Sequence, residues 1–236
     1  MQLMAQAGIH GLIGLQSRRL IPYEKGLYPS IIIGSFIPDI DIILVAIFSS
    51  VYTIEESTSI FHRTFSHSFF SLIIVYLFFM IMSEVKKDIQ LKIIGKGIAI
   101  GILLHIILDT FLWFHGVHFL WPLPFDKFNL WKSIQIPTTL RQFILSLEFL
   151  FFRIYAWFLV KQYLSNPIHN GWFISFLTKW MKIEFILFIL FLVFLYFEIP
   201  SFTFLFGLAY IPSLIMAIIS TLLMWQSIEP TQKEQI

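Results

Sequence analysis

Six stretches of the sequence are long and apolar enough to cross a lipid bilayer, and this feature restricts the fold more than any other. A membrane-spanning helix needs about 20 mostly apolar residues. Hydrophobic residues make up 58% of the 236 positions, which is more than a soluble core of this size could bury. The sequence therefore predicts an all-α fold, a polytopic transmembrane helical bundle. The stretches lie at about 27–49, 67–83, 93–114, 141–161, 183–199 and 201–225.

A further apolar segment, Met1 to Leu15, precedes the positively charged Arg18, Arg19 and Lys25. A cleaved signal peptide carries its positive charge before the apolar stretch. The reverse order favours a retained short helix that enters the membrane. We therefore expect six membrane helices, or seven if this segment also spans.

The lysines and arginines are divided unequally between the two predicted sides of the membrane. Because positively charged loops stay in the cytoplasm, we expect loops 50–66 and 115–140 outside and the C-terminus in the cytoplasm. Trp121 and Trp131 in the second loop suit the membrane boundary. The richer side holds Arg18, Arg19, Lys25, Lys86, Lys87, Lys92, Lys96, Lys161, Lys179, Lys182 and Lys233, and the other holds Arg63, Lys127, Lys132 and Arg141.

Composition narrows the function classes. The net charge of +2 is too small, and its lysines and arginines too scattered, for a nucleic-acid partner, so membrane lipids are the expected surroundings. Cysteine is absent, which leaves only nitrogen and oxygen as strong metal ligands. We expect residues 1–236 to form a single integral membrane domain.

Two carboxylates stand beside a helix-breaking proline in the first long stretch, in the motif Pro38-Asp39-Ile40-Asp41. Ionisable groups in a membrane span cost a few kcal/mol each, so they call for a partner or a function. Asp39 and Asp41 would not point the same way on a regular helix. A break at Pro38 would help them converge.

Histidines add to this pair. His105 and Asp109 are four residues apart and share a helix face, a spacing that allows both to bind one ion. His67 begins a predicted helix, and His62 with Arg63 precedes it on the outer side. His115 and His118 follow in the outer loop, where we expect interfacial residues, and His169 lies on the cytoplasmic side.

Depth connects these residues. At 1.5 Å per residue, Asp41, His105 and Asp109 should lie roughly 12, 14 and 8 Å below the outer ends of their helices. Glu148 and His10 fall at roughly 10 and 12 Å by the same reasoning. Separate helices thus place acidic and imidazole groups in one layer near the outer face. Arg153, deeper in the same helix, is expected to neutralise or pair with Glu148.

Mixed histidine and carboxylate ligands suit Zn, Mn or Fe. We expect one or two divalent ions, with zinc or manganese favoured. The candidate metal ligands are His10, Asp39, Asp41, His62, His67, His105, Asp109 and Glu148.

Several short motifs follow one another in the first half of the chain. They are His10-Gly11, Pro38-Asp39-Ile40-Asp41, His62-Arg63, Ser66-His67-Ser68, His105 with Asp109, and Trp121-Pro122. In this order they resemble the YdjM-like family of membrane-bound metal-dependent hydrolases, over roughly residues 1–125. The resemblance implies a multi-helix inner membrane protein with hydrolase activity. It also implies metal ligands at His10, Asp39, Asp41, His67, His105 and Asp109. Residues 126–236 add an outer loop and C-terminal membrane helices.

The leading hypothesis is an enzyme that hydrolyses an ester or phosphoester bond, in a lipid or lipid-linked substrate. Asp41 or His67 would act as general base, and Arg63 would stabilise charge developing on a phosphate. A divalent-cation transporter or channel is the alternative, but the cytoplasmic halves of the helices contain almost no polar residues for a path. The third hypothesis is a structural membrane protein in which a metal staples the bundle.

Overall fold

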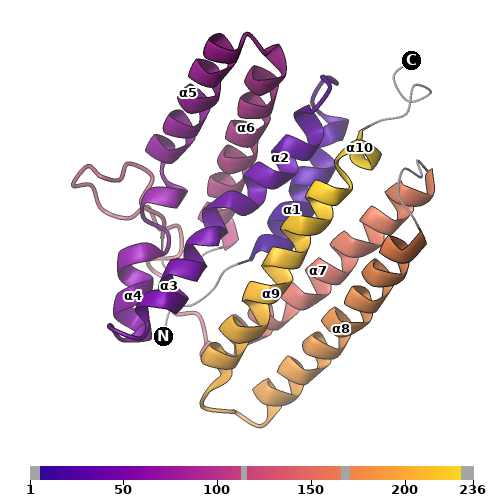
Figure 1. Cartoon of the computed structure of the whole chain (residues 1–236). Helices are drawn as coiled ribbons and strands as arrows, with labels where there is room; N and C mark the ends of the chain where they lie inside the picture. Colours follow the sequence, from indigo (N-terminus) through magenta and orange to yellow (C-terminus); the bar gives the residue numbers. More distant parts are fainter. Residues whose placement is uncertain (1–5, 113–115, 166–170, 230–236) are drawn as a thin grey trace.

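The computed structural model describes residues 6–112, 116–165 and 171–229, and helices dominate this part of the chain (Figure 1). Within these ranges no strand forms beyond an isolated bridge between Val117 and Phe128. The predicted all-α class is confirmed. The helices are α1 (Ala7–Gln16), α2 (Leu27–Phe36), α3 (Ile42–Phe48), α4 (Ile54–Phe61), α5 (Phe69–Lys86), α6 (Ile89–Leu112), α7 (Thr138–Ser165), α8 (Gly171–Tyr196), α9 (Phe202–Leu223) and α10 (Trp225–Ile228). Short 3-10 turns lie at η1 (Ser17–Arg19), η2 (Ile37–Asp41) and η3 (Phe65–His67).

Five helical segments of the described chain are long and apolar enough to cross a membrane. They are Leu27–Phe48, which joins α2, η2 and α3, and helices α5, α6, α7 and α9. Helix α8 has 26 residues but contains Lys179, Lys182 and Glu184. Helix α1 has 10 residues and is about 15 Å long, half the thickness of the hydrocarbon core. The predicted count of six to seven therefore goes slightly beyond these five.

Pro38 produces the break expected beside the aspartates. The α-helix ends at Phe36, and η2 carries Pro38, Asp39 and Asp41 before α3 resumes at Ile42. Proline lacks an N–H and disturbs the preceding turn, so the backbone tightens here. Both aspartates are buried as a result.

Helices α2 and α6 pack closely against each other. A Cβ on Gly34 would lie 2.3 Å from the Ile98 carbonyl oxygen, and one on Gly101 would lie 2.2 Å from the Ile31 carbonyl oxygen. Small residues allow membrane helices to approach this closely. The approach brings His105 of α6 against the backbone of Ser35 in α2.

Helix α1 lies among α2, α7 and α9, and side chains from other elements satisfy its first backbone N–H groups (Figure 1). The amides of residues 6–8 donate in turn to Asp39 Oδ2, Tyr210 Oη and Glu148 Oε1. A helix that begins inside a membrane protein needs such acceptors because lipid offers none. The start of α1 is thereby fixed beside η2.

Candidate metal centre

Five side chains from four elements converge in the interior of the bundle. They are His10 of α1, Asp39 of η2, His67 of η3, and His105 with Asp109 of α6. Each is at most 1% exposed. Residues separated by about 100 positions in the chain therefore share one enclosed polar site.

The Nε2 atoms of His67 and His105 lie 3.0 Å apart at the centre of this group. Asp109 Oδ2 lies 3.4 Å from His67 Nε2 and 3.7 Å from His105 Nε2. Asp39 Oδ1 lies 3.7 and 3.8 Å from the same two nitrogen atoms. Two imidazole nitrogens and two carboxylate oxygens thus surround one small volume.

His10 completes the group from α1. Its Nε2 lies 3.3 Å from Asp109 Oδ1, and its ring stacks on that of His105 with centroids 3.8 Å apart. Its Nδ1 donates to the Gln6 carbonyl at 2.6 Å. The Nδ1 of His105 likewise donates to the Ser35 carbonyl at 2.8 Å. In a neutral ring a protonated Nδ1 leaves the lone pair on Nε2, so both rings present a ligand atom to the cluster.

Asp41 organises the neighbouring residues. Its Oδ1 accepts from His62 Nδ1 at 2.6 Å, and its Oδ2 accepts from the Arg63 backbone at 3.1 Å and from Ser66 Oγ at 2.5 Å. Because the Ser66 proton is directed at Asp41, its Oγ accepts from His67 Nδ1 at 2.9 Å. These two hydrogen bonds, from His67 to Ser66 and from Ser66 to Asp41, hold the His67 ring with Nε2 facing the cluster. Metal-binding imidazoles are commonly oriented by a carboxylate in this way.

Arg63 provides positive charge at the edge of the cluster. Its backbone has φ of 60°, in the left-handed region that non-glycine residues rarely occupy. This conformation lets its N–H reach Asp41 while its Nε lies 2.9 Å from Asp109 Oδ2. One residue thereby contacts both carboxylates.

Two observations fit this cluster to a cation. Asp39 Oδ1 and His10 Nε2 are buried and have no hydrogen-bond partner among the described residues. Ionised Asp39, Asp41 and Asp109 outnumber the guanidinium of Arg63, which leaves two negative charges uncompensated when the imidazoles are neutral. Such charges are costly away from water unless they are paired or coordinate a metal.

The possible ligand atoms form two overlapping sets, each within 4.8 Å. One set is His10, Asp39 and His105, and the other is His67, His105 and Asp109. His105 belongs to both sets but has one free lone pair, so it can bind one ion, and a second ion would depend on the remaining ligands of the other set. The nitrogen and oxygen donors match the ligand types expected from the sequence.

Other candidate residues lie around this centre and not within the two sets. Asp41 and His62 are hydrogen-bonded to each other at its edge. Glu148 is also buried, but it accepts from the Gly8 amide at the start of α1. The expected pairing of Arg153 with Glu148 is not formed, because Arg153 donates to the Met181 carbonyl and lies over the Phe185 ring.

Among the described residues, His118 is separate from the cluster. His118 lies in the loop after α6, where burial together with Lys127 lowers its pKa below the usual range. His115 and His169 fall outside the described residues.

Sequence reasoning missed three groups that support the ligands. Tyr210 of α9 donates to Asp39 Oδ2 at 3.1 Å, and its buried hydroxyl in an apolar span was a usable signal. Ser66 links His67 to Asp41 and lies within the recognised motif. The Ser35 carbonyl has no signature in sequence, because every residue carries one.

The fold and the site define a polytopic α-helical membrane protein with a buried histidine and aspartate cluster. The chain matches the YdjM inner membrane protein family over residues 4–210, and it belongs to that family. The match extends well past residue 125, where the recognised motifs end. No match was found among curated proteins or among solved structures. The chain is thus an inner membrane protein, as the motifs implied.

Proposed function

We propose that the protein is a metal-dependent hydrolase that cleaves an ester or phosphoester bond in a lipid or lipid-linked substrate. The observation that carries this proposal is the convergence of His10, His67 and His105 Nε2 atoms with Asp39 and Asp109 oxygens. Their anchored Nδ1 atoms and buried carboxylates are the features of a metal centre.

His10, Asp39, His67, His105 and Asp109 would hold one or two divalent ions, zinc or manganese by donor type. When bound, such an ion supplies a Lewis acid and lowers the pKa of a coordinated water toward neutrality. His105 is common to both ligand sets, but its single free lone pair, on Nε2, could hold only one of two ions.

The chain's own residues complete the proposed site. Asp41 and Ser66 are the members of the network that line a groove beside the cluster. Asp41 would serve as general base there, with His62 holding its Oδ1 and with the Arg63 amide and Ser66 Oγ holding its Oδ2. His67 is the other candidate base that the sequence suggested, but its hydrogen bonds direct it toward the ligand role. Arg63, fixed against Asp109, stabilises negative charge developing on the substrate.

We also propose that the cluster lies in the outer half of the membrane and that the C-terminus is cytoplasmic. The α5–α6 turn and α10 lie at one end of the bundle, and α3–α4 with the α8–α9 turn lie at the other (Figure 1). The first end carries Lys86, Lys87 and Lys92. The positive-inside rule then assigns that end to the cytoplasm.

The test compares purified wild type with Asp41→Ala and His105→Ala on phospholipid and lipid-phosphate substrates. His118→Ala is the matched control, because that histidine lies in the loop outside the cluster. We expect hydrolysis by wild type and the control and its loss in both cluster variants. Equal activity in all four proteins would contradict the proposal. Zinc or manganese uptake into proteoliposomes, without hydrolysis, would instead support the transporter.

A further inference from the structure

A groove of about 590 Å³ opens beside the cluster, a size typical of ligand pockets, which span about 300–1,000 Å³. One wall carries Ile40 and Leu44 of the η2–α3 segment, and the other carries Ile60 and Phe61 of α4. Trp121 from the loop after α6 also lines it. The groove thus runs between a membrane span and the short helix that follows it.

The polar side chains of this groove that are linked to the cluster lie at one place. Asp41 and Ser66 line it, and they are hydrogen-bonded to each other and to the cluster. Thr64 is the further polar side chain in the lining, and its hydroxyl donates to the Ile60 carbonyl. The groove therefore pairs apolar walls with a single polar contact point, which belongs to the proposed active site.

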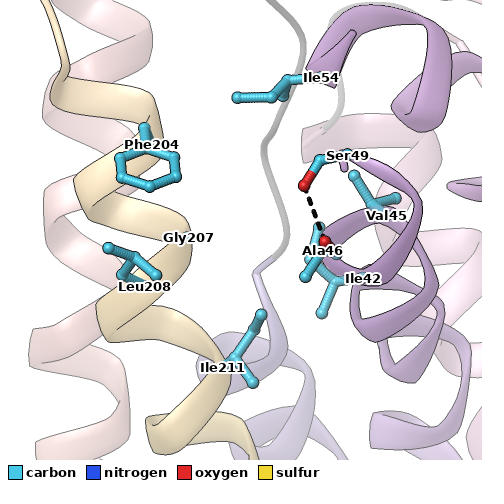
Figure 2. A pocket seen from close by; sticks show the side chains of 9 residues that line it. All are labelled: Ile42, Val45, Ala46, Ser49, Ile54, Phe204, Gly207, Leu208 and Ile211. Atoms are coloured by element: carbon cyan, nitrogen blue, oxygen red, sulfur yellow. Dashed lines mark hydrogen bonds between the residues drawn. The ribbon is translucent and has the colours of Figure 1, made fainter. Parts of the chain in front are cut away.

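A second cleft on α3 provides a contrast (Figure 2). Its volume is about 120 Å³, and it lies between α3 and α9, with Leu208 and Phe204 facing Ile42. Its polar side chain, Ser49, donates to the Ala46 carbonyl at 2.7 Å. This cleft has the features of an ordinary lipid-facing surface, because no charged group lines it.

We propose that the groove beside Asp41 and Ser66 binds the hydrocarbon chain of an amphiphilic substrate, with its polar head at those two residues. A peptide would need hydrogen-bond partners along its backbone, whereas a hydrocarbon chain needs none. The apolar walls and single polar end match an amphiphile. This inference rests on the proposed function for the head group's reaction, but chain binding itself requires no catalysis.

The groove positions the substrate's hydrocarbon chain and adds little to its binding affinity. A bilayer is as apolar as the groove walls, so moving a chain between them gains little hydrophobic free energy. The head group at Asp41 and Ser66 supplies the preference for this place. Placement of this kind raises reaction rates by fixing the reacting groups near one another.

The experiment uses a monoacylglycerol with a photoreactive diazirine in its chain, added to the purified full-length protein, because the hydroxyl groups of its head can donate to the Asp41 carboxylate. Labelled peptides are identified by mass spectrometry in wild type, Leu44→Trp and Ile60→Trp, which fill the groove from opposite walls. Leu208→Trp is the matched control, because it makes the same change in the cleft of Figure 2. Asp39→Asn alters the cluster and leaves the groove lining unchanged.

We expect labelling of the α3 and α4 walls in wild type, Leu208→Trp and Asp39→Asn, and a several-fold loss in both groove variants. An excess of unlabelled monoacylglycerol should reduce the wild-type signal. Labelling spread over the lipid-facing helices, or unchanged by both groove variants, would overturn the inference. Groove labelling without hydrolysis of any substrate would leave chain binding supported and contradict the proposed enzyme. Hydrolysis with labelling elsewhere would support the proposed enzyme and contradict chain binding in the groove.

Discussion

The Nε2 atoms of His67 and His105 face each other at 3.0 Å in the interior of the bundle. His105 donates its Nδ1 proton to the Ser35 carbonyl, and His67 donates its own to Ser66 Oγ. When both rings are neutral, two lone pairs therefore point at the same place, where they repel unless a positive charge lies between them. Carboxylate oxygens of Asp39 and Asp109 border that point, which makes a cation the natural occupant.

Tyr210→Phe tests how strongly the hydrogen bond to Asp39 affects the metal affinity of the cluster. The change removes a donor to Asp39 Oδ2 and leaves the Ala7 amide without its acceptor. We expect metal affinity to fall about tenfold and the free energy of unfolding to fall by about 1–3 kcal/mol. Chelator competition and thermal unfolding measure the two effects.

Tyr155→Phe is the control for that experiment. Tyr155 is also fully buried, but its hydroxyl bonds to Thr221 at 2.5 Å. Its loss should reduce stability and leave metal affinity unchanged. If both tyrosine variants weakened metal binding equally, the positioning role of Tyr210 would be wrong.

Gly101→Ala tests the close approach of α2 and α6. Exchanging glycine for alanine in a helix interior usually stabilises it by about 0.5–1 kcal/mol. At Gly101 the new Cβ would lie 2.2 Å from the Ile31 carbonyl oxygen, so we expect destabilisation by about 1–3 kcal/mol and weaker metal binding. Gly207→Ala, with nothing within 4 Å of its Cβ, should be neutral or stabilising in the same unfolding assay. A Gly101→Ala protein as stable as wild type would contradict the packing described for these helices.

Helix α4 should loosen when its N-terminal cap is lost. Thr53 Oγ1 accepts from the Glu56 amide, and Glu56 Oε2 accepts from the Thr53 amide, which forms a capping box. Thr53→Ala should speed amide hydrogen exchange in α4 about fivefold, the effect of a typical cap. Exchange in α9 should not change.

The same cap makes the stability of α4 depend on pH. Hydrogen bonds from the backbone and side chain of Thr53 lower the pKa of Glu56 below its usual range. A carboxyl whose pKa is lower in the folded state stabilises that state above its unfolded pKa, near 4.3, and loses this effect as pH falls through the folded value. After correction for the intrinsic rate, α4 exchange should accelerate as pH falls below about 4 in wild type but not in Glu56→Gln. Matching pH profiles in the two proteins would rule out this contribution.

The meeting of His10, His105 and Asp109 could be predicted from sequence because helix rise is constant. Counting residues placed Asp41, His105 and Asp109 in one layer, and added His10 from a helix whose path was unknown. The structure brings His105, Asp109 and His10 together. The membrane made this prediction possible, since it confines helices to nearly parallel directions and penalises stray ionisable groups.

The partners of individual side chains could not be predicted in the same way. Glu148 was a candidate ligand, yet it accepts from the Gly8 amide because α1 begins beside α7. Arg153 was expected near Glu148, but the path of α8 offers it the Met181 carbonyl and the Phe185 ring. Such choices depend on helix rotation and on backbone groups, which hydrophobic periodicity does not specify.

The most direct measurement of the central claim is the metal content of the purified protein, determined by mass spectrometry after incubation with zinc or manganese and removal of free ions. We expect one or two divalent ions per chain in wild type, a higher unfolding temperature with metal than with chelator, and loss of both effects in Asp39→Asn combined with His105→Ala. The Tyr155→Phe protein should retain the wild-type stoichiometry. A wild-type protein that holds no stoichiometric metal and unfolds at the same temperature with and without chelator would contradict the assignment of this cluster as a metal centre.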